Sequence, residues 1–289
     1  MALTTAQAFS EFLDKISPTD KQREEITKKR EATEKYLREA FPPSDTLPLK
    51  RVILIGSAAR GTIIRPINDI DVIAEFRNRD GVFEQYRNDS SAFLQRIRTG
   101  LNAKTSIGKI GARGQAVRLF YQNGAHVDIA PVFKWSETGF ALPRGNGSWM
   151  TTDPEAQSTW YAQRRESVGP SLSPLCKLVR RWNKVHGHRF ESFHLEVMVA
   201  SMFKSVGLDY RQALKCFFEW APQRIDVNDP AGHSGSLAAY LTRDDQRAIK
   251  SRLSEALDRS KRAIAAETQG DHTEAKRLWR IELGDEFSN

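Results

Sequence analysis

Two apolar strand-like segments that carry aspartates constrain the fold of this chain more than any other feature. The first runs from Ile70 to Phe76 and follows Asp69, so that Asp69 and Asp71 stand two positions apart. Successive side chains of a strand point to opposite faces, and both carboxylates therefore project from the same face. Two neighbouring carboxylates repel each other strongly unless a cation lies between them. This segment therefore predicts a divalent metal site on a sheet.

The second segment, His126 to Phe133, places Asp128 within another apolar strand, where aspartate is uncommon. It follows a strand-like run from Ala116 to Tyr121, and the connecting Gln122-Asn123-Gly124-Ala125 is typical of a hairpin turn. A hairpin strand beside the Asp69 strand would bring Asp128 to the same face. Three carboxylates can hold two Mg²⁺ ions about 3.5–4 Å apart, which is the arrangement for in-line phosphoryl transfer.

A glycine–serine turn lies upstream of these aspartates. The β-branched run from Val52 to Ile55 predicts a buried strand, which ends at Gly56 and is followed by Ser57. Glycine lets the backbone turn closely around a ligand, and the hydroxyl and N–H groups of Ser57 suit phosphate oxygens. Gly56 and Ser57 are therefore candidates for binding a nucleotide triphosphate, and the alternative role of Ser57 is simply to end the strand.

Helical patterns flank this α/β region on both sides. Two helices are expected before Pro42, and from Ser173 onward apolar residues recur at helical spacing to the end of the chain. Residues 134–171 are polar with scattered Gly, Pro and Trp, and are expected to form long loops and one short helix. We expect N-terminal helices packing on both halves (1–45), an α/β core (46–170) and a helical domain (171–289), with the active-site cleft between the last two.

Composition indicates where in the cell the protein is expected, but it does not decide the function. The 289 residues carry a formal charge of +8, which fits a nucleic-acid surface, a pocket for polyphosphate or a solvated basic face. No apolar run approaches the roughly 20 residues of a membrane span, and residues 1–15 lack a signal-peptide pattern. Cys176 and Cys216 have no metal-binding spacing. A cytoplasmic protein without a membrane partner is expected.

The Gly-Ser turn, the Asp-x-Asp strand and the later strand aspartate together resemble the polymerase-β-type nucleotidyltransferase superfamily. Within it, the chain resembles the cyclic GMP–AMP synthase/DncV-like nucleotidyltransferases (CD-NTases) of bacterial anti-phage systems over residues 51–202. The stretches that carry this narrower resemblance are Gly139-Phe140-Ala141-Leu142-Pro143, Trp149-Met150-Thr151-Thr152-Asp153-Pro154, Leu175 to Asn183, and Ser192-Phe193-His194-Leu195-Glu196.

This resemblance implies an α+β fold with a polymerase-β-like nucleotidyltransferase core, in which a small mixed sheet carries helices, and a C-terminal helical bundle. It also implies that Asp69, Asp71 and Asp128 are catalytic and bind Mg²⁺ or Mn²⁺, with Asp128 helping to activate the acceptor hydroxyl. Gly56 and Ser57 would cradle the triphosphate. The resemblance further implies that Lys177 and Ser192 contact the triphosphate from the helical half. The alternative for Lys177 is a solvated lysine on the polar side of its helix, and the alternative for Ser192 is a simple helix N-cap.

The implied activity is synthesis of a cyclic di- or trinucleotide second messenger from NTPs, ATP among them, for recognition by a downstream effector. Activation by a protein or a nucleic acid fits the family. Two enzymatic alternatives keep the same carboxylates: a linear oligoadenylate-like synthase, and a transferase acting on RNA or protein. A non-catalytic nucleic-acid-binding protein with a transferase-like core is the alternative from another class, and it predicts the loss of a carboxylate.

Overall fold

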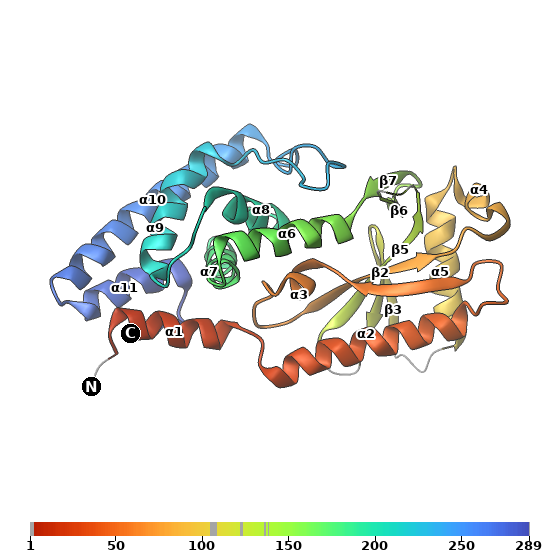
Figure 1. Ribbon diagram of the computed structural model, residues 1–289, viewed down its shortest axis with the longest axis horizontal. Helices are drawn as coiled ribbons and strands as arrows, with labels where there is room; N and C mark the ends of the chain where they lie inside the picture. The colour runs from red at the N-terminus through yellow and green to blue at the C-terminus, as the bar shows by residue number, and fades with distance from the viewer. Residues whose placement is uncertain (1–2, 105–108, 122–123, 136, 138, 289) are drawn as a thin grey trace. The chain divides into compact units, whose positions relative to one another are not determined.

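The structure, a computed structural model, describes residues 3–104, 109–121, 124–135, 137 and 139–288 of the 289-residue chain. Its contacts divide the chain into two compact units. The sheet unit consists of residues 19–59 and 67–158, and the helical unit of residues 1–18, 60–66 and 159–289. Figure 1 labels the helices and strands of both units.

In the described part of the chain, a mixed seven-stranded sheet forms the centre of the sheet unit. The order is β1–β2–β5–β4–β3, with β6 pairing to β5 and β7 to β6. Strands β2 and β5 are parallel, and the other pairs are antiparallel. The strands are β1 (Leu49–Leu54), β2 (Asp69–Phe76), β3 (Lys109–Arg113), β4 (Ala116–Phe120), β5 (His126–Lys134), β6 (Phe140–Pro143) and β7 (Trp149–Thr152).

Two long helices, α2 (Asp20–Ala40) and α5 (Ser90–Lys104), cover one face of this sheet (Figure 1). Helix α2 begins at a reciprocal capping box between Thr19 and Gln22, which satisfies N–H groups that the first turn leaves without partners. Side chains from the covered face, including Ile70 and Val72, are buried against these helices. The shorter elements are α3 (Gly56–Arg60), a 3₁₀ turn (Arg79–Gly81) and α4 (Phe83–Tyr86).

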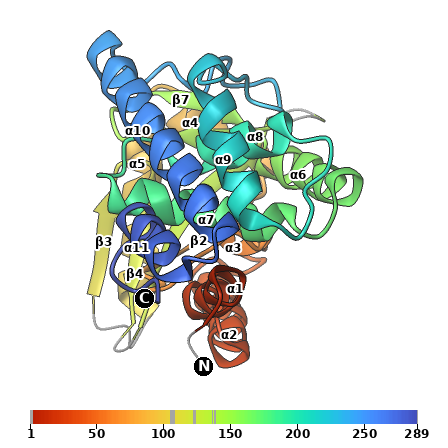
Figure 2. The same cartoon turned by 90° about the vertical axis from the view of Figure 1, so that its left-hand side faces the viewer.

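The helical unit has a separate apolar core. Phe9 of α1 meets Trp279 of α11 edge to face at a centroid distance of 5.1 Å, and Phe12 meets Phe287 at 5.2 Å. Helix α11 also contacts α10 and α7, and α10 lies beside α11 in Figures 1 and 2. The helices are α1 (Thr5–Ile16), α6 (Pro154–Val168), α7 (Leu172–Val185), α8 (Ser192–Met202), α9 (Tyr210–Trp220), a 3₁₀ turn (Ala221–Gln223), α10 (Arg243–Thr268) and α11 (His272–Leu283).

A buried carboxylate ties residues 60–66 into the helical unit, although they lie between β1 and β2 in the sequence. Glu196 of α8 has no accessible side-chain surface. It accepts hydrogen bonds from Arg60 Nε at 2.5 Å, Thr62 Oγ1 at 2.6 Å and Arg180 Nη1 at 2.6 Å. A buried charge is tolerated only when it is paired and hydrogen-bonded, so these four side chains depend on one another.

The predicted α+β class is confirmed, and so is the hairpin, which β4 and β5 form. Gln122 and Asn123 of its predicted turn lie outside the described residues. The expectation of loops and one short helix over residues 134–171 is wrong, because β6 and β7 pair there and α6 has 15 residues. The predicted domains 1–45, 46–170 and 171–289 stay a prediction, since the two units above are defined by contacts alone.

Among the described residues, no helix combines the length and the apolar character that crossing a lipid bilayer requires.

Replacing Glu196 by alanine should lower the free energy of unfolding by about 3–5 kcal/mol, because Arg60 and Arg180 would lose their buried counter-charge. Chemical denaturation followed by circular dichroism measures this loss. Glu191→Ala is the matched control, since Glu191 is exposed at the start of the same helix and its side chain makes no capping hydrogen bond. The control should cost less than about 1 kcal/mol, and equal losses in both variants would contradict the importance of the buried network.

Candidate active site

The parallel pairing of β2 with β5 brings the three predicted aspartates to one face of the sheet. In the register of the two strands, Asp71 pairs with Asp128 and Asp69 pairs with His126. This is the face opposite to the one that α2 and α5 cover. Asp69 is exposed, Asp71 is half-buried and Asp128 is 9% exposed. The placement agrees with the sequence prediction, whereas the role of the aspartates as metal ligands stays a prediction.

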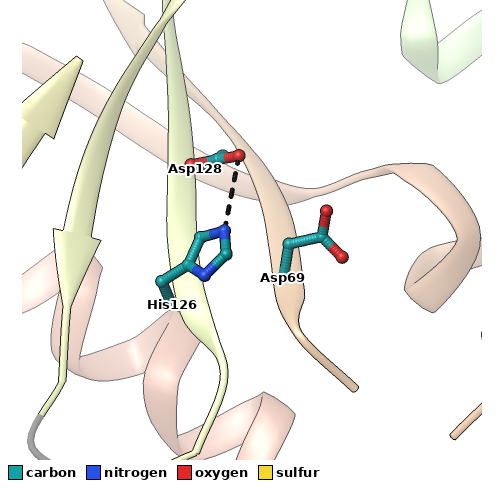
Figure 3. Close-up of side chains that lie close together, drawn as sticks. All are labelled: Asp69, His126 and Asp128. Carbon is teal, nitrogen blue, oxygen red and sulfur yellow. Dashed lines mark ion pairs between the residues drawn. The ribbon is translucent and has the colours of Figure 1, made fainter. Parts of the chain in front are cut away.

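Donor atoms of three side chains converge at this face. One ligand atom each from Asp69, His126 and Asp128 lies within 4.8 Å of the other two. Figure 3 shows Asp128 and His126 on one strand and Asp69 on its neighbour, with 3.8 Å between His126 Nε2 and Asp128 Oδ2. Carboxylate oxygens and imidazole nitrogens are ligands of divalent metal ions. The donor set therefore fits a divalent cation.

Arg118 of β4 lies directly opposite Asp128 in the antiparallel register. Its Nε and Nη2 atoms donate to Asp128 Oδ1 and Oδ2, each at 2.7 Å. The hydrogen bond to Asp128 raises the pKa of Arg118 against the opposing effect of burial, and the charges of Asp69 and Asp71 add to the increase. Arg118 thus fixes the plane of the Asp128 carboxylate and offsets one of three negative charges.

The sequence prediction missed both His126 and Arg118. His126 stands two positions before Asp128, so strand alternation alone would have placed the two on one face. The position of Arg118 opposite Asp128 follows only from the hairpin register, which the described residues establish through β4 and β5.

The glycine–serine turn lies against the Asp71 carboxylate. Ile55 N–H donates to the Asp71 backbone oxygen at 3.0 Å, and the chain then turns at Gly56, which has φ +67°. A Cβ atom at Gly56 would stand 2.5 Å from Asp71 Oδ2, closer than any real contact of that kind. Ser57 follows, half-buried in the first turn of α3. The structure therefore places Gly56 and Ser57 beside the acidic face, which is the sheet face that carries Asp69, Asp71 and Asp128.

Lys177 and Ser192 belong to the helical unit. Lys177 of α7 is half-buried, and its Nζ donates to Ser17 Oγ at 2.9 Å. Ser192 is exposed and is the first residue of α8, because Glu191 has the extended backbone of the N-cap position. The alternative role of Ser192 as the N-cap is therefore wrong. Contact of either residue with a nucleotide stays a prediction.

A family model now accounts for this arrangement. Residues 3–164, more than half of the chain, match the model of the Second Messenger Oligonucleotide or Dinucleotide Synthetase domain (SMODS). The chain belongs to the SMODS family. Its resemblance to the CD-NTases is thereby confirmed, and the chain is a nucleotidyltransferase.

Two curated relatives and one solved structure extend this assignment. A "Probable cyclic nucleotide synthase" of Bacillus cereus is 26% identical over 273 residues, which cover 82% of either chain. The cyclic AMP-AMP-AMP synthase of Escherichia coli is 26% identical over 211 residues, 66% of this chain and 64% of that protein. The structure of Escherichia coli CdnC in complex with HORMA covers 99% of this chain and 98% of CdnC with a TM-score of 0.79 at 20% identity. That likeness confirms the predicted nucleotidyltransferase fold.

Replacing Gly56 by alanine should displace Asp71 and lower turnover of NTPs by more than about tenfold, since the added methyl group would overlap the Asp71 carboxylate. Gly61→Ala is the control, because Gly61 has a similar φ of +71° but open space at its Cβ position. Both changes should cost about 1–2 kcal/mol in stability through backbone strain, measured as a lower melting temperature. Equal turnover by the two variants would show that the contact with Asp71 does not matter.

Proposed function

We propose that this chain joins NTPs into a cyclic di- or trinucleotide, which serves as a second messenger in bacterial anti-phage signalling. The observation that carries the proposal is the register of β2 and β5, which gathers Asp69, Asp71 and Asp128 on one face beside the turn at Gly56. Such a face suits a reaction in which two phosphate-bearing substrates must be held against a metal. The membership in the SMODS family supports the same reaction.

Asp69, Asp71 and Asp128 would hold Mg²⁺ or Mn²⁺. The chemistry that the metal supplies when bound there is activation of the acceptor hydroxyl and neutralisation of charge on the departing pyrophosphate. Asp128 would help to take up the proton of that hydroxyl. Because Arg118 holds both oxygens of Asp128 at 2.7 Å, the carboxylate keeps one orientation towards the acceptor.

The donor triphosphate would lie along Gly56 and Ser57. Gly56 has no side chain to obstruct the approach of a phosphate, and Ser57 offers a hydroxyl and a backbone N–H. Lys177 would supply a positive charge to the same triphosphate, and Ser192 a hydroxyl. The hydrogen bond from Lys177 Nζ to Ser17 limits the freedom of the lysine, so less entropy is lost when it binds phosphate.

The relatives support particular substrates and partners. The Escherichia coli relative is named a cyclic AMP-AMP-AMP synthase, which supports ATP as a substrate of this chain. A first phosphodiester would give a linear product, which would then turn over in the site so that a second or third bond closes the ring. The CdnC complex with HORMA supports an activating protein as a partner, and a downstream effector would recognise the cyclic product.

The purified protein, incubated with labelled NTPs and Mg²⁺ or Mn²⁺, should yield a phosphatase-resistant product. Its mass should be two waters below that of two NMPs, or three waters below that of three, because each phosphodiester of the ring corresponds to the loss of one water from the NMPs. The product resists phosphatase because a closed ring has no terminal phosphate. Phosphatase-sensitive ladders would instead support a linear synthase. A product found only after addition of RNA or protein would support transfer to that acceptor.

The double variant Asp69→Asn/Asp71→Asn should reduce product formation by roughly three orders of magnitude or more, because neutral amides hold a divalent cation poorly. Asp258→Asn is the control, since Asp258 is 71% exposed on α10 and its ion pair with Arg262 is long at 3.9 Å. Unchanged turnover in the double variant would refute the proposed mechanism.

A further inference from the structure

We propose that His126 is a metal ligand that shifts the preference of the acidic face from Mg²⁺ towards Mn²⁺ and similar transition-metal ions. The inference rests on the proposed function, in which Asp69, Asp71 and Asp128 bind divalent metal. It adds a nitrogen donor to a set that otherwise contains only carboxylates, and it concerns which ion the site selects.

The position of His126 follows from the parallel register. His126 pairs with Asp69 across the two strands and stands two residues before Asp128 on its own strand, so the three side chains share one face. Two donors bound to one ion at about 2.1 Å lie about 3.0–4.2 Å apart. The 3.8 Å between His126 Nε2 and Asp128 Oδ2 falls within this interval, and all three donor atoms lie within 4.8 Å (Figure 3). Small side-chain movements would complete the coordination.

A purely structural role as the partner of Asp128 explains His126 less well. His126 Nε2 and Asp128 Oδ2, at 3.8 Å, are too far from each other for a hydrogen bond. Arg118 already donates to both oxygens of Asp128, so the carboxylate does not depend on the imidazole for its charge balance. The Phe120 ring, on the neighbouring strand, packs beside the imidazole at a centroid distance of 5.8 Å. This contact restricts the rotation of the His126 imidazole and so favours one direction for its Nε2 atom.

Nitrogen ligation has a definite chemical consequence. Mg²⁺ binds oxygen ligands almost exclusively and keeps several of its waters, whereas Mn²⁺, Co²⁺ and Zn²⁺ accept imidazole. A neutral imidazole also adds a ligand without adding charge. Arg118 offsets the charge of one of the three carboxylates, so electrostatic attraction alone gives the site a lower affinity for a cation. Mg²⁺ and Mn²⁺ carry the same charge, so the carboxylates attract them similarly. The imidazole nitrogen of His126 therefore decides which of the two ions the site prefers.

The test measures metal binding directly, on the nucleotide-free protein. The electron paramagnetic resonance signal of free Mn²⁺ gives the Mn²⁺ affinity, and competition gives the Mg²⁺ affinity. The unsubstituted protein should bind Mn²⁺ at least about tenfold more tightly than Mg²⁺. His126→Gln, which offers an oxygen instead, should weaken Mn²⁺ binding by about 10–100-fold and Mg²⁺ binding by less than about threefold. The control His233→Gln, in the helical unit, should change neither affinity.

Spin-echo spectroscopy of the Mn²⁺-loaded unsubstituted protein adds a measurement that needs no variant. Coupling of the Mn²⁺ electron spin to an imidazole nitrogen is expected, and its absence would overturn the inference even if His126→Gln failed to fold. An unchanged ratio of the two affinities in a folded His126→Gln protein would overturn it as well.

The Asp69→Asn/Asp71→Asn protein separates this inference from the proposed function. If it loses Mn²⁺ binding while His126→Gln keeps the original preference, the carboxylate site stands and only the role of His126 fails. If the unsubstituted protein binds neither ion, both the proposed function and this inference are overturned.

Discussion

The parallel pairing of β2 with β5 is the constraint on which the rest of the site depends. Because side chains alternate along a strand, the register decides which of them share a face. In the observed register Asp71 faces Asp128, while the apolar neighbours of both enter the core beneath α2 and α5. A slip of one residue would turn a carboxylate into that core, at a cost of several kcal/mol for each charge. The packing that stabilises the sheet unit therefore also selects the groups that meet on the opposite face.

The features of this arrangement that depend only on neighbouring residues could be predicted from the sequence. Asp69 and Asp71 share a face because of their spacing alone, and the Asn-Gly turn predicts a hairpin whatever its surroundings. The meeting of Arg118 with Asp128 depends on register, which spacing within one strand does not encode. The strands β6 and β7, of four residues each, depend on pairing with β5 and with each other, so local propensity gives little sign of them. The proposed contacts of Lys177 and Ser192 with a nucleotide rest on family resemblance alone, because a lysine on a helix and a serine at a helix start are common without any phosphate ligand.

Arg118 explains how three carboxylates can gather on one sheet before any ligand arrives. A guanidinium group presents two parallel N–H donors to a carboxylate, so it fixes both the position and the plane of Asp128. A lysine could supply the charge but not the plane. Because the same side chain also lies in the field of Asp69 and Asp71, it reduces the repulsion across the whole face. The positive charge that balances part of this face is thus supplied by a side chain of the protein itself.

The network at Glu196 has a consequence for how the chain is made. Arg60 ends α3, directly after the turn at Gly56, yet its buried partner lies 136 residues further along the chain. At roughly 5–20 residues per second, the ribosome takes roughly 7–27 s to synthesise that interval. Throughout this time the end of α3 has no acidic partner from α8. The turn at Gly56, although encoded in the first quarter of the chain, therefore precedes a helix whose last residue stays without this partner until α8 has been synthesised.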